Sequence, residues 1–345
     1  MRHALRNRIQ RLHERLVVLV VAGVVAAGVA AGVALARTGT ASIGTGVVVI
    51  DTKLGYADSA AAGTGMVLTS SGEVLTNNHV IRGATSIRIV IPGTTHVYTA
   101  KVVGYDLADD VAVLQASGAS HLKTVSTSSS TLRVGQRVTA VGNANGTGRL
   151  ASARGSITGL HKSISVSDDQ GGTENLSGLI ETNAAVQPGD SGGPLLSSAG
   201  KVIGMDTAAS SGTFFRSTAS DSYAIPITKA LSIAKQIEGG HATARVHVGS
   251  TAFLGIEVQG AAAPGNVSTP GVVVAGVVPG GPADSAGLTA GDVITAIDGH
   301  AITSPSSVTS YLLTKKPGAK VTIAYTDQFG VGHSVSVTLA SGPPQ

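Results

Sequence analysis

The stretch QPGDSGGPLLSS (residues 187–198) surrounds one serine, Ser191, with small residues and prolines. A serine hydroxyl is a poor nucleophile until a neighbouring base removes its proton, and the oxyanion formed on attack needs fixed hydrogen-bond donors. The glycines at positions 189, 192 and 193 leave room for a substrate and permit unusual backbone angles. Gly-Asp-Ser-Gly is also ordinary turn chemistry, so this stretch alone is compatible with a nucleophile or with a plain β-turn.

A candidate base and a candidate carboxylate occur earlier in the chain. GEVLTNNHVI (72–81) alternates like a strand, and we interpret His79 as lying at the end of that strand. In DLADDVAVLQ (106–115), Asp110 directly precedes an apolar strand, where a lone buried carboxylate would be costly without a partner. Asp106 and Asp109 are interpreted as solvent-facing turn residues. His79 could instead cap a turn, but the three residue types together can form a nucleophile, base and orienting acid.

The order His79, Asp110, Ser191 is the order of chymotrypsin-type proteases. The segments AAGTGMVLTSSGEVLTNNHVI, DDVAVLQ, TNAAVQPGDSGGPLLSSAGKVIGMDTA and SYAIPI together resemble the HtrA/Deg family of serine proteases, in its membrane-anchored actinobacterial form. The resemblance covers about residues 45–340. It implies a mainly β fold, in which a chymotrypsin-like double β-barrel protease domain is followed by a PDZ domain, with an N-terminal transmembrane helix.

The resemblance also implies roles for individual residues. Ser191 would attack the scissile carbonyl, His79 would act as base and then as acid, and Asp110 would orient His79. The backbone N–H groups of Gly189 and Ser191 would form the oxyanion hole. Ala185 would lie at the base of the S1 pocket, where a small apolar side chain favours cleavage after small or medium aliphatic residues over cleavage after Lys or Arg.

Asp190 departs from the family, which usually has Asn at this position. In digestive proteases an Asp there pairs with an N-terminal ammonium created by activation, and an anchored chain has no such amine nearby. We therefore expect Asp190 to be solvated or paired with Arg154 or Arg216. These arginines lie in the segments 153–180 and 207–221, which we interpret as flexible loops. An alternative is that the resting site is misformed until a loop moves.

The N-terminal segment predicts a membrane anchor. Residues 1–15 form a basic tail, and residues 16–36 are 21 consecutive uncharged residues, which as a helix would span ~30 Å. The arginines before this span predict a cytoplasmic N-terminus, so the catalytic and PDZ domains would lie outside the cytoplasmic membrane. A cleaved signal peptide is the alternative, because Ala34-Leu35-Ala36 resembles a cleavage site. The length of the apolar run favours the anchor.

Charge and composition exclude several classes of protein. The formal charge is +4, and the five arginines and one glutamate of residues 1–15 account for all of it. No basic face is left for nucleic acid. The absence of cysteine excludes disulfides, a thiol nucleophile and thiolate metal sites. His241 and His247 are the closest pair that could share a metal ion, and we interpret them as part of a solvated linker. We therefore expect no metal and no cofactor.

Outside the anchor, the chain divides into a linker at 37–45, the protease domain at 46–239, a second linker at 240–250, the PDZ domain at 251–340 and a disordered tail at 341–345. Short β-branched runs separated by turn residues fill the protease domain, as expected for a β-barrel. A helix is predicted over 228–238, since Leu231, Ala234 and Ile237 share a face and Gly239-Gly240 follows.

The segments AFLGIEV (252–258), GVVVAGVVPGGPADSAGLTAGDVITAIDGHAI (271–302) and SVTSYLLTKKPGAKVTIAYT (307–326) resemble a PDZ domain. Such a domain binds peptide C-termini by adding a strand to its sheet. The resemblance implies a carboxylate-binding loop at Leu254-Gly255-Ile256 and a groove wall formed by Val308, Tyr311 and Leu312. For Ile256 and Leu312, a place in the ordinary domain core is an equally good interpretation.

The expected function is a membrane-anchored serine endopeptidase that acts on misfolded or specific envelope polypeptides. The main alternative is an anchored PDZ scaffold or chaperone with an inactive protease site. An esterase using the same three residues is a weaker alternative, since the flanking segments match proteases. A homotrimer is expected from the resemblance alone.

Overall fold

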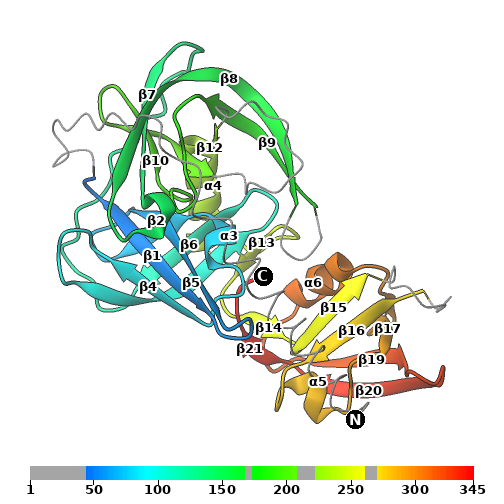
Figure 1. Ribbon diagram of the computed structural model, residues 1–345. Coiled ribbons are helices and arrows are strands. Elements are labelled where there is room, and N and C mark those ends of the chain that lie inside the picture. Colours follow the sequence, from blue (N-terminus) through cyan, green and yellow to red (C-terminus); the bar gives the residue numbers. More distant parts are fainter. Residues whose placement is uncertain (1–43, 168–172, 208–221, 261–269) are drawn as a thin grey trace, which may run out of the picture. The chain divides into compact units, whose positions relative to one another are not determined.

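The computed structural model describes residues 44–167, 173–207, 222–260 and 270–345. The predicted anchor at 16–36, the basic tail before it and Arg216 lie outside these residues. Within the described ranges, no helix is both long enough and apolar enough to cross a bilayer. The described chain is mainly β, with two barrels and a smaller third domain (Figure 1).

The first barrel is built from β1 (Val47–Leu54), β2 (Ser59–Val67), β3 (Glu73–Thr76), β4 (Ser86–Val90), β5 (Val97–Asp106) and β6 (Val111–Ala116). The antiparallel order is β5-β4-β1-β2-β3-β6, and pairing of β5 with β6 closes it. Apolar side chains at alternate positions of the strands fill the interior, among them Val48 and Ile50. The short helix α3 (Asn78–Ile81) follows β3 directly.

The second barrel is closed in the order β10-β11-β12-β9-β8-β7. Its strands are β7 (Arg137–Gly142), β8 (Ala151–Ser167), β9 (Thr173–Thr182), β10 (Pro194–Ser197), β11 (Val202–Thr207) and β12 (Ser222–Pro226), and a 3-10 turn η1 (Ala144–Gly146) follows β7. The interpretation of 153–180 as a flexible loop is wrong, because β8 and β9 form a long hairpin there. Ile157, Ile164 and Leu179 of this hairpin are buried, and their packing outweighs a composition typical of turns.

The predicted helix is confirmed as α4 (Ile227–Glu238). It buries Ile233, Ala234 and Ile237 in the same apolar cluster as residues from both barrels. Gly239 caps the end of the helix, and Gly240 then adopts a positive φ of 71°, a conformation that glycine reaches without strain.

The third domain contains a sheet in the order β15-β16-β17-β19-β20, with β18 paired to β17. Its elements are β14 (Thr251–Phe253), β15 (Ile256–Gly260), β16 (Val272–Val277), α5 (Pro282–Ser285), β17 (Val293–Ile297), β18 (His300–Ala301), α6 (Pro305–Leu313), β19 (Lys320–Thr326), β20 (Gly332–Thr338) and β21 (Ala340–Gly342). Ser304 caps α6 through the backbone N–H of Ser307. Because β15 ends the described sheet, its outer edge is a place where a peptide strand can be added.

Two segments expected to be unstructured are ordered. In the predicted linker 240–250, β13 (Val246–Val248) pairs with β5, and His247 is buried with its ring 5.0 Å from that of Tyr105. In the predicted disordered tail, β21 pairs with β14, and the carbonyl of Pro344 accepts a hydrogen bond from the backbone N–H of Gly83 at 2.8 Å. In both segments, backbone N–H and C=O groups form hydrogen bonds with an existing sheet edge or loop. Amino-acid composition does not reveal such partners.

Candidate active site

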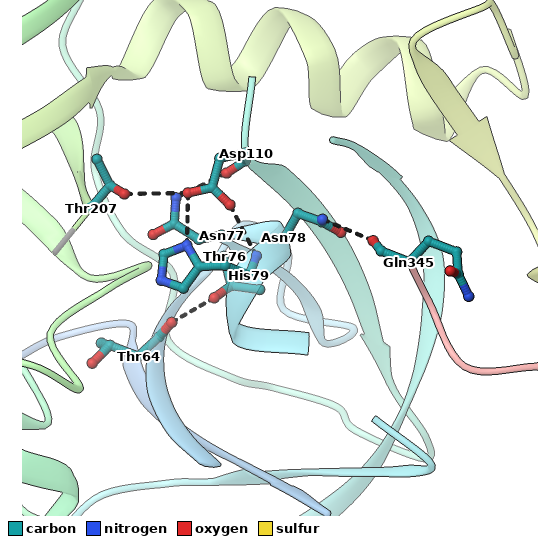
Figure 2. Close-up of polar contacts among 8 residues, drawn as sticks. All are labelled: Thr64, Thr76, Asn77, Asn78, His79, Asp110, Thr207 and Gln345. Carbon is teal, nitrogen blue, oxygen red and sulfur yellow. Dashed lines mark hydrogen bonds and ion pairs between the residues drawn. The ribbon is translucent and has the colours of Figure 1, made fainter. Parts of the chain in front are cut away.

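The side chains of His79 and Asp110 are brought together (Figure 2). His79 lies on α3, so the interpretation of His79 as a strand-end residue is wrong: β3 stops at Thr76 and one helical turn follows. Asp110 directly precedes β6, as predicted, and has a φ of +53°. Asp is among the few residues that tolerate this left-handed conformation. The turn directs the Asp110 carboxyl toward α3.

The Asp110 carboxyl receives three hydrogen bonds, although only 2% of its side chain is exposed. Oδ1 accepts from the backbone N–H of His79 at 2.9 Å, and Oδ2 lies 2.8 Å from His79 Nδ1. Oδ2 also accepts from Thr207 Oγ1 at 3.2 Å. These donors compensate for burial of the acid. With Nδ1 bonded to a carboxylate, the other ring nitrogen, Nε2, is left to accept a proton.

The turn that carries Ser191 belongs to the second barrel but is bonded to the first. The backbone N–H of Thr64 on β2 donates to the Ser191 carbonyl at 2.9 Å, and Thr64 Oγ1 donates to the Gly189 carbonyl at 2.7 Å. Thr76 Oγ1 donates to the Thr64 carbonyl at 2.7 Å. Since Thr76 lies three residues before His79, this chain of bonds joins the Ser191 turn to the start of α3.

Two glycines are required by this close approach. A Cβ on Gly192, whose φ is +84°, would lie 2.2 Å from the Thr64 carbonyl oxygen and 2.3 Å from Thr76 Oγ1. A Cβ on Gly189, at φ +93°, would lie 2.3 Å from the Asn143 carbonyl oxygen. Any side chain at either position would push the turn away from the residues that hold it.

Ala185, the residue predicted to lie at the base of the S1 pocket, is near the surface. Ala185 is exposed on the segment between β9 and β10, six residues before Ser191. The segment 208–221, which directly follows Thr207, lies outside the described residues. The S1 assignment of Ala185 and the oxyanion role of Gly189 and Ser191 therefore stay predictions.

Asp190 is buried, with 5% of its surface exposed. Its Oδ2 accepts from the backbone N–H of Gln187 at 2.8 Å, and burial raises the pKa of Asp190 to about 6. Arg154 is exposed on β8 and makes no ion pair with Asp190, so neither solvation nor pairing with Arg154 holds. Asp206, which is fully buried on β11, has a pKa raised well above its usual value, first by burial and second by the charge of Asp190.

The two acids interpreted as solvent-facing turn residues have structural contacts. Asp106 is buried, and its Oδ1 accepts from the backbone N–H of Asp109 at 3.0 Å. Asp109 is largely buried and pairs with Lys229 at 2.6 Å and Arg245 at 2.7 Å. These contacts tie the turn before Asp110 to α4 and to the chain leading into β13.

Sequence reasoning missed Thr64, Thr76, Asp206 and Thr207. Threonine is common on strands, so the residue type gave no sign that the three threonines support the site. Asp206 did carry a signal, because an acid directly follows the apolar run VIGM (residues 202–205).

Thr207→Val is expected to lower kcat about fivefold, the equivalent of one net hydrogen bond. The change removes the third donor to Asp110 while nearly preserving the volume of the side chain. The measurement is steady-state hydrolysis of a peptide substrate. Thr207→Ser keeps the hydroxyl and should retain activity, and equal loss in both variants would contradict this role.

The predicted peptide groove in the third domain is partly core. Leu254 and Leu312 are buried in its apolar cluster, and Ile256 is half-buried against that cluster. Gly255 adopts a φ of +79°, and its carbonyl accepts from the backbone N–H of Val278 at 2.9 Å. Of the predicted wall residues on α6, Val308 is core, while Tyr311 donates through its hydroxyl to Asp298 at 2.8 Å.

Comparisons with known proteins agree with this architecture. Residues 63–205 match the trypsin-like peptidase domain and residues 252–328 match the PDZ domain. The serine protease PepD of Mycobacterium tuberculosis is 33% identical over 87% of this chain and 64% of its own length. The Do-like serine protease HtrA of Lactococcus lactis subsp. lactis is 34% identical over 76% of this chain and 67% of its own length.

A solved structure is also similar. A variant of the HtrA-type protease AlgW with a tripeptide is 28% identical, covers 89% of this chain and 99% of its own, and has a TM-score of 0.50. This chain spans about two thirds or less of the length of PepD and of the probable periplasmic protease HhoA-like of Haemophilus influenzae. A trypsin-like peptidase domain, a PDZ domain and 34% identity to HtrA over 76% of the chain therefore place the chain in the HtrA family of serine proteases.

Proposed function

We propose that this chain is a serine endopeptidase in which His79, Asp110 and Ser191 perform the chemistry. The observation that carries the proposal is the His79–Asp110 pair at 2.8 Å, together with the hydrogen bonds that join the Ser191 turn through Thr64 on β2 to Thr76 at the end of β3, just before the helix of His79. Asp110 holds the imidazole in the tautomer whose Nε2 can accept the Ser191 proton.

In the proposed reaction Ser191 Oγ attacks the scissile carbonyl carbon while His79 Nε2 takes its proton. The tetrahedral oxyanion is held by the N–H groups of Gly189 and Ser191. His79 then gives the proton to the leaving amine, which leaves an acyl-enzyme. Water attacks the ester with His79 again acting as base, and Ser191 regains its proton when the acid product leaves.

Labelling of the serine tests this assignment. The full chain, purified in detergent micelles, is incubated with casein before and after treatment with a sulfonyl fluoride. We expect digestion to stop in step with the appearance of one sulfonyl group on the peptide that contains Ser191. Continued digestion by fully labelled protein, or label on another serine with loss of digestion, would overturn the assignment.

A substrate preference for small or medium aliphatic residues before the scissile bond is expected. The proposal rests on Ala185, whose side chain offers no charge or hydrogen bond to a basic residue. Profiling with a peptide library measures the preference directly. Selection of Arg or Lys at that position would show that another residue forms the base of the pocket.

For location, we propose that residues 16–36 anchor the chain in the cytoplasmic membrane and that both folded domains act outside it on misfolded or specific envelope proteins. The support is the length of the apolar run and the arginines before it. A mature N-terminus at Arg37 would instead indicate a cleaved signal peptide.

For partners, we propose that the PDZ domain binds peptide C-termini along the outer edge of β15, beside Leu254-Gly255-Ile256 and α6 with Leu312. The position of β15 at the end of its sheet supports this. A homotrimer is proposed from family membership, and light scattering of the purified chain would measure its mass.

A further inference from the structure

Backbone hydrogen bonds join Asp190 and Asp206 through the turn that carries Ser191. The backbone N–H of Asp206 donates to the Gly193 carbonyl at 2.7 Å, and its carbonyl accepts from the N–H of Gly192 at 2.8 Å. The N–H of Gly193 donates in turn to the Asp190 carbonyl at 2.9 Å. Asp206 is thus bonded on both sides to the two glycines that follow the nucleophile, while Asp190 precedes it.

Most of the carboxyl oxygens of this pair have no hydrogen-bond partner. Within the described ranges, Asp190 Oδ1 and both side-chain oxygens of Asp206 are buried and unbonded. Asp190 Oδ2 alone has a donor, the backbone N–H of Gln187. Such oxygens are rare in folded proteins, because an unpaired buried carboxylate is costly.

Among the residues that the structure describes, no Lys, Arg or His side chain forms an ion pair with Asp190 or Asp206. On the neighbouring strands, the half-buried Glu181 of β9 pairs with the exposed Lys162 of β8. The side chains of Arg137 on β7, Arg154 on β8 and Lys201 before β11 are exposed. His79 and Asp110 face the opposite side of β11, since Thr207 contacts Asp110 and successive side chains of a strand alternate. Among the residues that the structure describes, the charge that raises the pKa of Asp206 is that of Asp190.

Two adjacent buried carboxyls without a cation do not both ionise near neutral pH. A proton on one of them turns an unpaired acceptor into an O–H donor, and the other acid then has a partner. The pKa values agree: that of Asp190 rises to about 6 and that of Asp206 rises well above its usual value.

We propose that Asp190 and Asp206 share a proton, and that this shared proton makes Asp206 a positioning residue for the Ser191 turn. An O–H of Asp206 donating to Asp190 Oδ1 ties β11 to the residue before the nucleophile. Loss of the shared proton at alkaline pH leaves two buried anions whose repulsion displaces the turn. The catalytic part of this inference rests on the proposed endopeptidase function, whereas the shared proton does not.

The first test needs no activity. Both pKa values are raised in the folded state, so the native chain binds protons more tightly and stability is lost as pH rises through those values. The unfolded Asp190 carboxyl is already ionised at pH 5, so for Asp190 alone a folded-state pKa of about 6 corresponds to roughly a tenfold fall in the folding equilibrium constant between pH 5 and pH 8. Denaturant unfolding of the full chain at pH 5 and pH 8 should show this fall in the wild type and a much smaller fall in Asp206→Asn.

A matched control separates this pair from other buried acids. Asp292 is buried in the third domain, where its Oδ2 accepts from the backbone N–H of Thr289 at 2.8 Å. Asp292→Asn should leave the pH dependence of the protease-domain transition as in the wild type. If Asp206→Asn behaves like the wild type or like this control, the shared proton is refuted.

The second test measures kcat and KM for a peptide substrate between pH 6 and 10. The wild type should lose kcat at the alkaline end, whereas Asp206→Asn, whose amide donates without ionising, should not. Asp206→Ala, which removes the proposed O–H donor to Asp190 Oδ1, should lower kcat about tenfold at pH 7 with KM little changed, and Asp206→Asn should restore it.

The outcomes of the two tests are distinguishable. Superimposable kcat profiles for the wild type and Asp206→Asn would refute the positioning role even if the unfolding test succeeds. If the wild type cleaves nothing, the endopeptidase proposal and the positioning role both fail, and the unfolding test alone decides the shared proton. If Asp206→Ala does not fold, the comparison of the wild type with Asp206→Asn still gives both results.

Discussion

Ser191→Ala is expected to abolish casein digestion, with a fall in kcat on the order of 10⁶-fold. The change removes the only atom that can form the acyl bond, while the turn keeps its bonds through the carbonyls of Ser191 and Gly189 to Thr64. The protein should therefore stay folded. Digestion is followed by release of acid-soluble peptides from casein by equal amounts of folded wild type and variant.

Ser198→Ala is the matched control, because Ser198 is exposed on the same segment seven residues further along. It should digest casein like the wild type. If Ser191→Ala also digests casein like the wild type, the protease site is not responsible for activity. If neither the wild type nor the variants digest casein, the anchored scaffold or chaperone becomes the better interpretation.

Asp110→Asn is expected to lower kcat about 10⁴-fold near neutral pH. An Asn there can still accept from the backbone N–H of His79, but its NH₂ group then faces His79 Nδ1. Two donors cannot share a hydrogen bond, so the imidazole places its proton on Nε2. In that tautomer His79 cannot take the proton of Ser191. Steady-state hydrolysis of a peptide substrate at pH 7 measures the loss.

Asp109→Asn tests whether this loss is specific to position 110. Asp109 is the preceding residue and pairs with Lys229 and Arg245 rather than with His79. Its replacement should leave kcat within about threefold of the wild type, since partly exposed ion pairs contribute little. Comparable losses in both variants would mean that the turn has been disturbed, and would contradict the orienting role of Asp110.

Local patterns predicted the strands and the helix α4 where each residue's burial follows from its neighbours in sequence. They did less well where long-range pairing decides the structure. The Ser- and Gly-rich segment 153–180 is the β8–β9 hairpin because each strand completes a barrel. Residues 246–248 and 340–342 are strands because β5 and β14 offer them an edge. Such partners lie far along the chain, and no local composition reports them.

The candidate active-site residues divide in the same way. The types and order of His79, Asp110 and Ser191, with glycines at 189 and 192, are readable from the chain because the chemistry and the turn both demand these residues. The tertiary structure alone decided that His79 lies on a helix, that Thr207 donates to Asp110, and that Asp206 is bonded to the two glycines that follow Ser191. Asp206 is fifteen residues beyond Ser191, and only closure of the second barrel places β11 against that turn, where burial changes the charge that an acid can carry.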